Sequence, residues 1–72
     1  MSRSKIYQIV GENIHIRRRR ARLSQEQLAE KVDLNTNYIG EIERAEKKIT
    51  LETLEKIAKA LGVHVRDLVD EL

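Results

Sequence analysis

Residues 24–44 have the sequence SQEQLAEKVDLNTNYIGEIER, and the pattern of this stretch decides the fold of the chain. Ser24, followed three residues later by Gln27, has the form of a capping box, which marks the start of a helix. We predict this helix over residues 25–32, because apolar residues then recur on one face. That face consists of Leu28, Ala29 and Val32.

A tight turn follows this helix. Asp33 tolerates the left-handed backbone that commonly ends a helix, and Asn35 is a favoured N-cap for a second helix, predicted over residues 36–44. Ile39 and Ile42 form the inward pair of that helix. The residues on its other side are Thr36, Asn37, Gly40, Glu41 and Arg44. Two short helices joined in this way have the geometry of a helix-turn-helix, whose second helix can enter the major groove of DNA.

Three further helices flank this motif. Apolar residues at helical spacing predict them over residues 5–21, 51–61 and 65–72. The stripe of the second of these helices consists of Leu51, Leu54, Ile57, Ala58 and Leu61. Residues 1–4 are expected to be a flexible tail, and residues 5–72 the domain. Because no strand pattern or internal repeat occurs, the sequence predicts a compact all-α bundle of five helices.

Composition excludes several classes of protein. With 72 residues and no cysteine, the chain forms one domain with a thin core and has neither disulfides nor a thiolate metal site. His15 and His64 are far apart in the sequence, so we expect no metal and no cofactor. No apolar run approaches the length of a membrane span, and we expect no secretory signal, because no apolar region follows the basic residues at the N-terminus. Without a catalytic constellation either, the sequence predicts a cytoplasmic protein that is not an enzyme.

Charge is unevenly distributed along the chain, although the net charge is only +2. Seven basic residues and one acidic residue, Glu12, precede Ser24, whereas three basic and five acidic residues follow from Ile49 onward. A chain with one basic end suits a polyanion such as DNA. A solvated charged face explains the arginine run equally well.

The sequence also carries a family resemblance. Residues 14–68 resemble the helix-turn-helix domains of the phage repressor and Cro type, also called the xenobiotic-response-element family. The matching segments are residues 11–14, 23–29, 38–44 and 51–63, together with Arg18. The resemblance implies a lambda-repressor-like fold and a DNA-binding transcriptional regulator, expected to be a repressor. The short chain further resembles the controller proteins of restriction–modification systems.

The resemblance assigns the base-reading positions to the second helix of the motif. Thr36 and Asn37 match the first positions that read base edges, and an asparagine can pair bidentately with adenine. Glu41 matches a later position that faces the groove. Its carboxylate can accept a hydrogen bond from cytosine but also repels phosphate, so a reading role and a neutral role both stay open.

A second set of residues is expected to contact the DNA backbone. Gln25 resembles a glutamine that touches a phosphate and braces the next helix. Tyr38 anchors a phosphate through its hydroxyl or packs its ring inward. Arg44 reaches the backbone or a guanine, or only complements the helix dipole. The remaining expected contacts are Arg19, Arg22, Lys47 and Lys48.

Arg18 lies on the apolar stripe of the first helix, and the resemblance pairs it with Glu43 in a buried ion pair. Four residues depart from the family pattern. Arg22, Asp33 and Ala45 stand where glycine is common, and Arg17 stands where leucine is common. Left-handed backbone at Arg22 and Ala45 would cost about 1 kcal/mol or more at each position.

A homodimer on a palindromic site in double-stranded DNA is expected, because one recognition helix reads only a few base pairs. The last helix offers an apolar stripe for the interface, consisting of Val65, Val69 and Leu72, while Leu68 is assigned to the core. The alternative function is a protein-interaction module of the same fold, such as an antitoxin or an antagonist of another regulator. A role on membrane surfaces ranks last, because the core needs the apolar stripe of the first helix.

Overall fold

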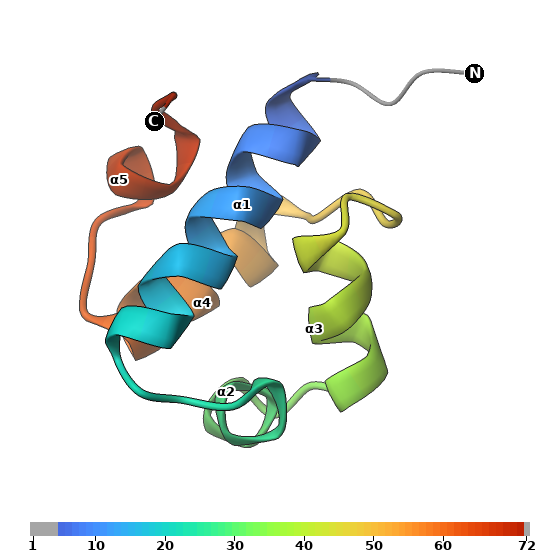
Figure 1. The fold of residues 1–72 in the computed structure, drawn as a ribbon, viewed down its shortest axis with the longest axis vertical. Coiled ribbons are helices and arrows are strands. Elements are labelled where there is room, and N and C mark those ends of the chain that lie inside the picture. Colours follow the sequence, from blue (N-terminus) through green and yellow to red (C-terminus); the bar gives the residue numbers. More distant parts are fainter. Residues whose placement is uncertain (1–4, 72) are drawn as a thin grey trace.

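The computed structural model describes residues 5–71, which form five α-helices without a strand (Figure 1). The helices are α1 (Lys5–Arg20), α2 (Gln25–Val32), α3 (Thr36–Glu43), α4 (Leu51–Leu61) and α5 (Val65–Val69). The predicted all-α fold of five helices is therefore confirmed. The tail expected at residues 1–4 and the dimer contact expected at Leu72 lie outside the described residues.

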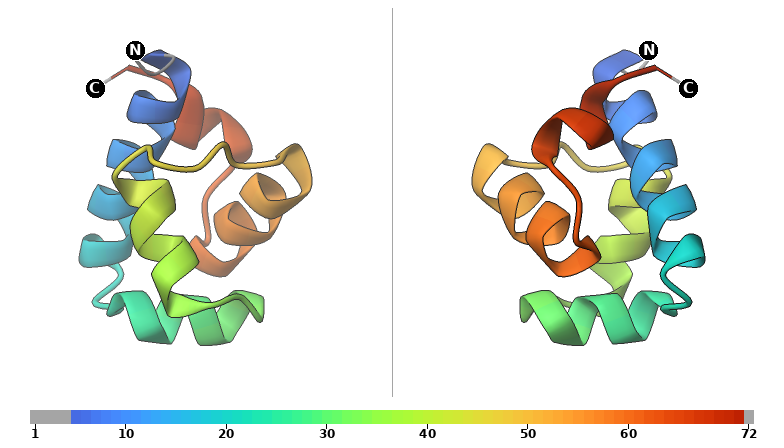
Figure 2. Two further views of the ribbon diagram at one scale, coloured as in Figure 1. Left: turned by 90° about the vertical axis from the view of Figure 1, so that its right-hand side faces the viewer. Right: turned by 90° about the vertical axis from the view of Figure 1, so that its left-hand side faces the viewer.

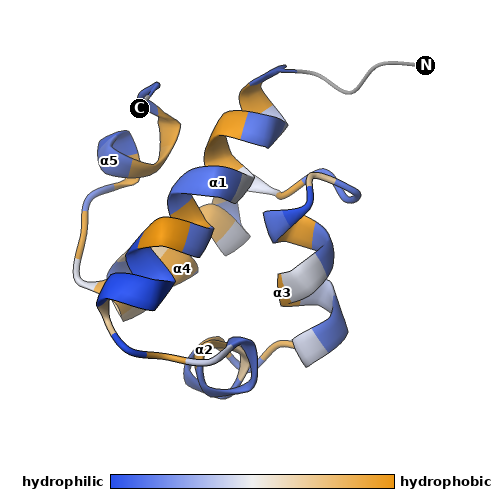
Figure 3. Cartoon of the chain, viewed as in Figure 1, coloured by the Kyte–Doolittle hydropathy of each residue, from blue (hydrophilic) through white to orange (hydrophobic). Residues whose placement is uncertain are grey.

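The five helices enclose one apolar core. α1 packs against α3, α4 and α5, while α2 packs against α3 and α4, and Figure 2 shows α2 closing one end of the molecule. Hydrophobic and hydrophilic residues alternate along α1 and α4 in Figure 3, as expected when one face of each helix is buried. The core residues are Val10, Ile14, Leu28, Ala29, Val32, Ile39, Ile42, Leu54, Ile57, Ala58 and Leu68.

Local hydrogen bonds fix the ends of α2 and the start of α3. Ser24 Oγ accepts from the backbone N–H of Gln27 at 3.0 Å, and Gln27 Oε1 accepts from the N–H of Ser24 at 2.8 Å. Asp33 ends α2 with a left-handed backbone at φ 56°, and Asn35 Oδ1 accepts from the N–H of Asn37 at 2.7 Å. Because helix-end amides are thus satisfied by side chains, the turn between α2 and α3 is well defined.

Among residues 5–71, two residues that are neither glycine, asparagine nor aspartate adopt the left-handed backbone. Arg22 and Ala45 have φ values of 60° and 59°, and each follows the end of a helix, where glycine is favoured. The strain considered from the sequence is present at both positions, at about 1 kcal/mol each.

The last helix is shorter than predicted. The sequence predicted it over residues 65–72, but α5 ends at Val69, and Asp70 is extended with ψ 142°. The cause is Asn13 on α1, which is 2% exposed. Its side-chain amide donates to the carbonyls of Leu68 at 3.0 Å and Asp70 at 2.8 Å, and these bonds hold the chain extended after Val69. α1 and α3 each end one residue before the predicted boundary.

The backbone of α3 lies directly against Gly11 of α1. A Cβ atom at this position would lie 2.5 Å from the carbonyl oxygen of Ile42 and 2.8 Å from that of Glu43. Both oxygens belong to the backbone of α3, so rotation of a side chain cannot relieve the contact. Glycine is therefore required for this helix crossing.

Arg18 and Glu43 form a buried ion pair beside that crossing. Arg18 Nε donates to Glu43 Oε2 at 2.6 Å and Nη2 donates to Oε1 at 3.1 Å, and the two side chains are 8% and 4% exposed. Arg18 Nη1 also donates to the carbonyl of Leu23 at 2.8 Å. His15 Nδ1 and Gln25 Nε2 lie 2.9 and 3.1 Å from Glu43 Oε1. One carboxylate thus connects α1, α2 and α3.

We predict that Gly11→Ala destabilises the protein by about 1–3 kcal/mol, because the added methyl group overpacks against the α3 backbone. Gly40→Ala is the matched control, since the nearest atom to its Cβ is Nη1 of the flexible Arg44 side chain, at 2.9 Å. That control should be neutral or more stable, because alanine is the better helix former. Urea unfolding measures the free energy of unfolding of both variants. Equal stability of Gly11→Ala and Gly40→Ala would contradict the close crossing of α1 and α3.

We predict that the Glu43 network is lost in acid. Burial raises the pKa of Glu43, but hydrogen bonds from Arg18, His15 and Gln25 outweigh it and hold the pKa below its ordinary value of 4.5. A carboxyl whose pKa is lower in the folded chain stabilises the fold above that ordinary value. The stabilisation then disappears as the pH falls through the lower, folded pKa.

Glu43→Gln tests this prediction. The substitution leaves Arg18 buried without a counter-charge and should cost about 3 kcal/mol at neutral pH. Because protonated wild-type Glu43 resembles the variant, the stability difference between the two proteins should narrow as the pH is lowered. Urea unfolding of both proteins between about pH 7 and pH 3 covers this titration. A difference that stays constant with pH would contradict the prediction.

Candidate nucleic-acid interface

The first turn of α3 is exposed. Thr36 and Asn37 are exposed, whereas Ile39 at 0% and Ile42 at 2% exposure anchor the opposite face of α3 in the core. In the left-hand view of Figure 2, α3 lies in front of the core, and α2 runs below it. A major groove about 12 Å wide accepts one helix presented in this way.

The middle of α3 is less exposed than its start. Glu41 is half-buried, and Tyr38 is half-buried with contact to the core, so its ring packs inward and a phosphate contact by its hydroxyl stays a prediction. Gly40, which the sequence analysis placed on the outward side, is buried. The reason is that Arg44 Nη1 and Gln25 Oε1 lie 2.9 and 3.5 Å from its Cβ position.

Gln25, the first residue of α2, braces the recognition helix. Its Nε2 donates to Glu43 Oε1 at 3.1 Å, so α2 and the end of α3 are linked by side chains as well as by the core. This contact is the bracing role that the resemblance implied for Gln25. The phosphate contact implied for the same residue stays a prediction.

Arg19 and Arg22 lie at the end of α1 that is nearest the motif. Arg19 is four residues after His15, which contacts Glu43 on α3, and residues at this spacing share a helix face. Arg22 lies in the turn that leads into α2, and both arginines are exposed. By the same reasoning Arg17, four residues after Asn13, lies on the side of α1 that faces α5. The register of α1 thus places Arg19 and Arg17 on different sides of the helix.

The segment after α3 carries further cations. Arg44 pairs with Glu46, with Nε to Oε2 at 3.0 Å and Nη2 to Oε1 at 3.1 Å. Hydrogen bonding to Glu46 raises the pKa of Arg44 further above its ordinary value, so the guanidinium stays charged. Lys47 and Lys48 are exposed in the loop that follows, at the right of Figure 1. Exposed cations therefore lie at the end of α1 and in the segment that follows α3.

The residues predicted for the dimer lie on a different element. Val65 on α5 is 36% exposed, and Val69 is half-buried and lines an apolar groove of about 220 Å³. The other residues of this groove are Ile6, Tyr7, Val10, Ile49, Leu51 and Leu54. Leu51, expected in the apolar stripe of its helix, is instead 82% exposed. As the first residue of α4 it lies beyond the core.

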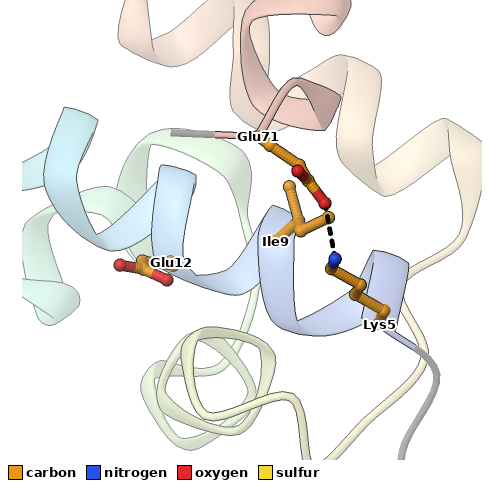
Figure 4. Close-up of a pocket in the computed structure, with 4 residues that line it drawn as sticks. All are labelled: Lys5, Ile9, Glu12 and Glu71. Carbon is orange, nitrogen blue, oxygen red and sulfur yellow. Dashed lines mark ion pairs between the residues drawn. The ribbon is translucent and has the colours of Figure 1, made fainter.

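A second hollow lies between the start of α1 and the end of the described chain (Figure 4). It is lined by Lys5, Ile9, Glu12 and Glu71, and Lys5 Nζ lies 2.8 Å from Glu71 Oε1. The two paired side chains are 77% and 61% exposed, and a pair this exposed stabilises little.

Within residues 5–71, no group of three or more His, Cys, Asp and Glu side chains could hold a metal ion. None of the helices in that range is long and apolar enough to cross a membrane.

Sequence comparison finds relatives of similar length. Control protein C.BamHI of Bacillus amyloliquefaciens is 43% identical over 63 residues, which cover 86% of this chain and 78% of that protein. Control protein C.SmaI of Serratia marcescens is 47% identical over 64 residues, which cover 89% of this chain and 76% of that protein.

Structure comparison agrees with these relatives. The restriction–modification controller protein C.AhdI of Aeromonas hydrophila has a TM-score of 0.85 at 31% identity, covering 90% of this chain and 98% of that chain. SinR, a master regulator for biofilm formation solved in complex with DNA, has a TM-score of 0.80 at 32% identity, covering 85% and 98% of the two chains. Residues 14–68 also match the profile of the family described as helix-turn-helix, and the chain therefore belongs to the helix-turn-helix family.

Proposed function

We propose that the chain is a sequence-specific DNA-binding transcriptional regulator, acting in the cytoplasm as a homodimeric repressor on a palindromic operator. The observation that carries this proposal is the arrangement of α3. Its exposed first turn carries Thr36 and Asn37, and its inner face and its end are fixed by the core and by Glu43. The names of the relatives, two control proteins and a regulator solved with DNA, support the same class of function.

Base recognition is assigned to the exposed turn of α3. Asn37 can donate to and accept from one adenine at the same time, and the methyl group of Thr36 can contact a thymine methyl. Glu41, one turn further along the helix, can accept from a cytosine amino group. Because the inner face and the C-terminal end of α3 are anchored, the helix presents these side chains to the groove in one orientation.

Backbone contacts supply affinity that does not depend on sequence. Cations that neutralise phosphates release counterions and make the affinity fall with added salt. In our proposal the cations come from both sides of α3, and Gln25 and Tyr38 add neutral hydrogen bonds to phosphate. The cations assigned to the backbone are Arg19, Arg22, Arg44, Lys47 and Lys48.

A binding selection from random duplex DNA at about physiological salt tests the proposed function. A sequence-specific dimer should enrich a motif with two-fold symmetry and half-sites about one helical turn apart. If the folded protein enriches no motif, the proposal of a specific regulator is wrong. That outcome would favour the alternative, a protein-interaction module of the same fold.

We predict that Asn37→Ala and Lys48→Ala weaken binding in different ways. Asn37→Ala should cost about 1–3 kcal/mol on the selected operator and leave binding to unrelated duplexes unchanged. Lys48→Ala should weaken binding to both DNAs. It should also reduce the slope of the logarithm of the binding constant against the logarithm of the salt concentration by about one unit. Fluorescence anisotropy titrations at several salt concentrations separate the two effects. An unchanged sequence preference in Asn37→Ala would remove this residue from the reading surface.

The proposed dimer interface combines α5 with the neighbouring apolar groove. Val65 and Val69 share one face of α5 at a spacing of four residues, and Val69 also lines the groove. Leu51 and Ile6, at 82% and 43% exposure, border the same groove. Apolar surface of this kind, continuous over three helices, is typical of an interface between subunits.

We predict that Leu51→Glu dissociates the dimer, raising its dissociation constant by about 100-fold or more, because a carboxylate would be buried without a partner. Because Leu51 is exposed in the monomer, the substitution should leave the monomer fold unaffected. Gln8→Glu, which adds the same charge at an exposed position of α1 outside the groove, is the control. Sedimentation at several concentrations distinguishes monomer from dimer. A dimeric Leu51→Glu protein would show that the interface lies elsewhere.

A further inference from the structure

Gly40 forms a notch on the surface of α3 that the guanidinium of Arg44 fills. Side chains in a helix point back toward its N-terminus, and Arg44 reaches back one turn until its Nη1 lies 2.9 Å from the Cβ position of Gly40. Its Cζ lies 3.7 Å from the same point. With any larger residue at position 40, the guanidinium would have to move. The absence of a side chain at Gly40 therefore leaves room for the charge of Arg44 one turn back along α3.

The notch faces the start of α2. Gln25 Oε1 lies 3.5 Å from the Cβ position of Gly40, so the guanidinium of Arg44 lies on the α2 side of the recognition helix. Thr36, four residues before Gly40, shares its stripe, while Asn37 and Glu41 share the neighbouring one. Gln25, which lies beside the guanidinium, is a residue to which the proposed function assigns a phosphate contact, and this makes a phosphate the expected DNA ligand of Arg44.

Glu46 forms an ion pair with this guanidinium in the free protein. Its two carboxylate oxygens accept from Nε and Nη2 of Arg44 at 3.0 and 3.1 Å, which is the same bidentate geometry that arginine uses for a phosphate. The side chains are 57% and 41% exposed. An exposed ion pair of this kind is weak, so a phosphate can displace the carboxylate.

We propose that Glu46 is an intramolecular competitor of DNA, and that Arg44 exchanges the Glu46 carboxylate for a backbone phosphate when DNA binds. This inference rests on the proposed function. Two costs follow for the complex, because the Arg44–Glu46 pair is broken and the released carboxylate remains close to DNA phosphates. Both costs act on every DNA sequence. Glu46 therefore lowers the affinity that the backbone contacts alone supply, and makes occupancy depend on the base contacts of α3.

Glu46→Gln tests the exchange. Gln keeps the size of the side chain but removes its charge, so the affinity should rise about 3–10-fold at low salt for the selected operator and for an unrelated duplex alike. The salt dependence should steepen by up to about one unit, because in the wild-type complex the released carboxylate of Glu46 offsets one of the cations that neutralise phosphates. Fluorescence anisotropy with both duplexes at several salt concentrations gives the affinity and the salt dependence.

Two further variants separate the exchange from a general effect of charge. Glu55→Gln makes the same change of net charge at an exposed position of α4 and should change the affinity less than 2-fold. When Arg44→Ala is already present, adding Glu46→Gln should give only a small part of this gain relative to Arg44→Ala alone, because the cation for which Glu46 and phosphate compete is absent. Equal gains in Glu46→Gln and Glu55→Gln would overturn the exchange, as would a full gain without Arg44.

The remaining outcomes are also decisive. Weaker binding by Glu46→Gln would mean that Glu46 holds Arg44 in its DNA-binding orientation, which is the opposite of competition. Wild-type protein that binds DNA with the same affinity as Glu46→Gln overturns the exchange alone. Wild-type protein that binds neither duplex overturns both the exchange and the proposed function.

Discussion

The carboxylate of Glu43 is the interaction on which the orientation of the recognition helix depends. It is 4% exposed, and a carboxylate buried to this degree is stable only with several partners. Arg18 and His15 reach it from α1, and Gln25 reaches it from α2. Because the partners come from both neighbouring helices, α3 cannot rotate or slide without exposing charge to the core. The buried carboxylate keeps all of its partners in only one position of α3, and the network therefore fixes that position.

This constraint matters because α2 and α3 would not keep a stable helical conformation on their own. α2 and α3 have eight residues each, and helices of that length are marginal in water when isolated. Their order comes from the core and from side-chain caps. Gly11 adds a steric part, since it lets the α1 backbone approach the carbonyls at the end of α3. Electrostatic and steric contacts therefore act on the same end of α3, while its first turn stays exposed.

The sequence was informative where the cause of a structure is local. The capping box of Ser24 and Gln27 and the inward pair on α3 follow from spacings of three or four residues, and both are present in the structure. Asn13 was missed because its partners are 55 and 57 residues away, and nothing near Asn13 indicates that it ends α5.

The exposure of surface residues was harder to predict for a related reason. Leu51 fits the periodicity of α4, but a helix face says nothing about whether the core extends as far as its first residue. Gly40 was placed outward from the same periodicity, yet Arg44 and Gln25 cover it. Roles in DNA contact could be assigned from the resemblance alone, because periodicity distinguishes buried from exposed positions and does not identify a ligand.

The two candidate surfaces are joined by one short loop, which gives their proposed functions a physical connection. Lys47 and Lys48 precede the N-cap Thr50 by only a few residues, and Leu51 follows it at the border of the apolar groove. In the proposed dimer, a subunit contact at Leu51 would restrict the loop that carries both lysines before DNA arrives. Cations that are already ordered lose less conformational entropy on binding a phosphate. Linkage then requires the reciprocal effect, so DNA would strengthen the dimer by the same factor by which dimer formation strengthens DNA binding.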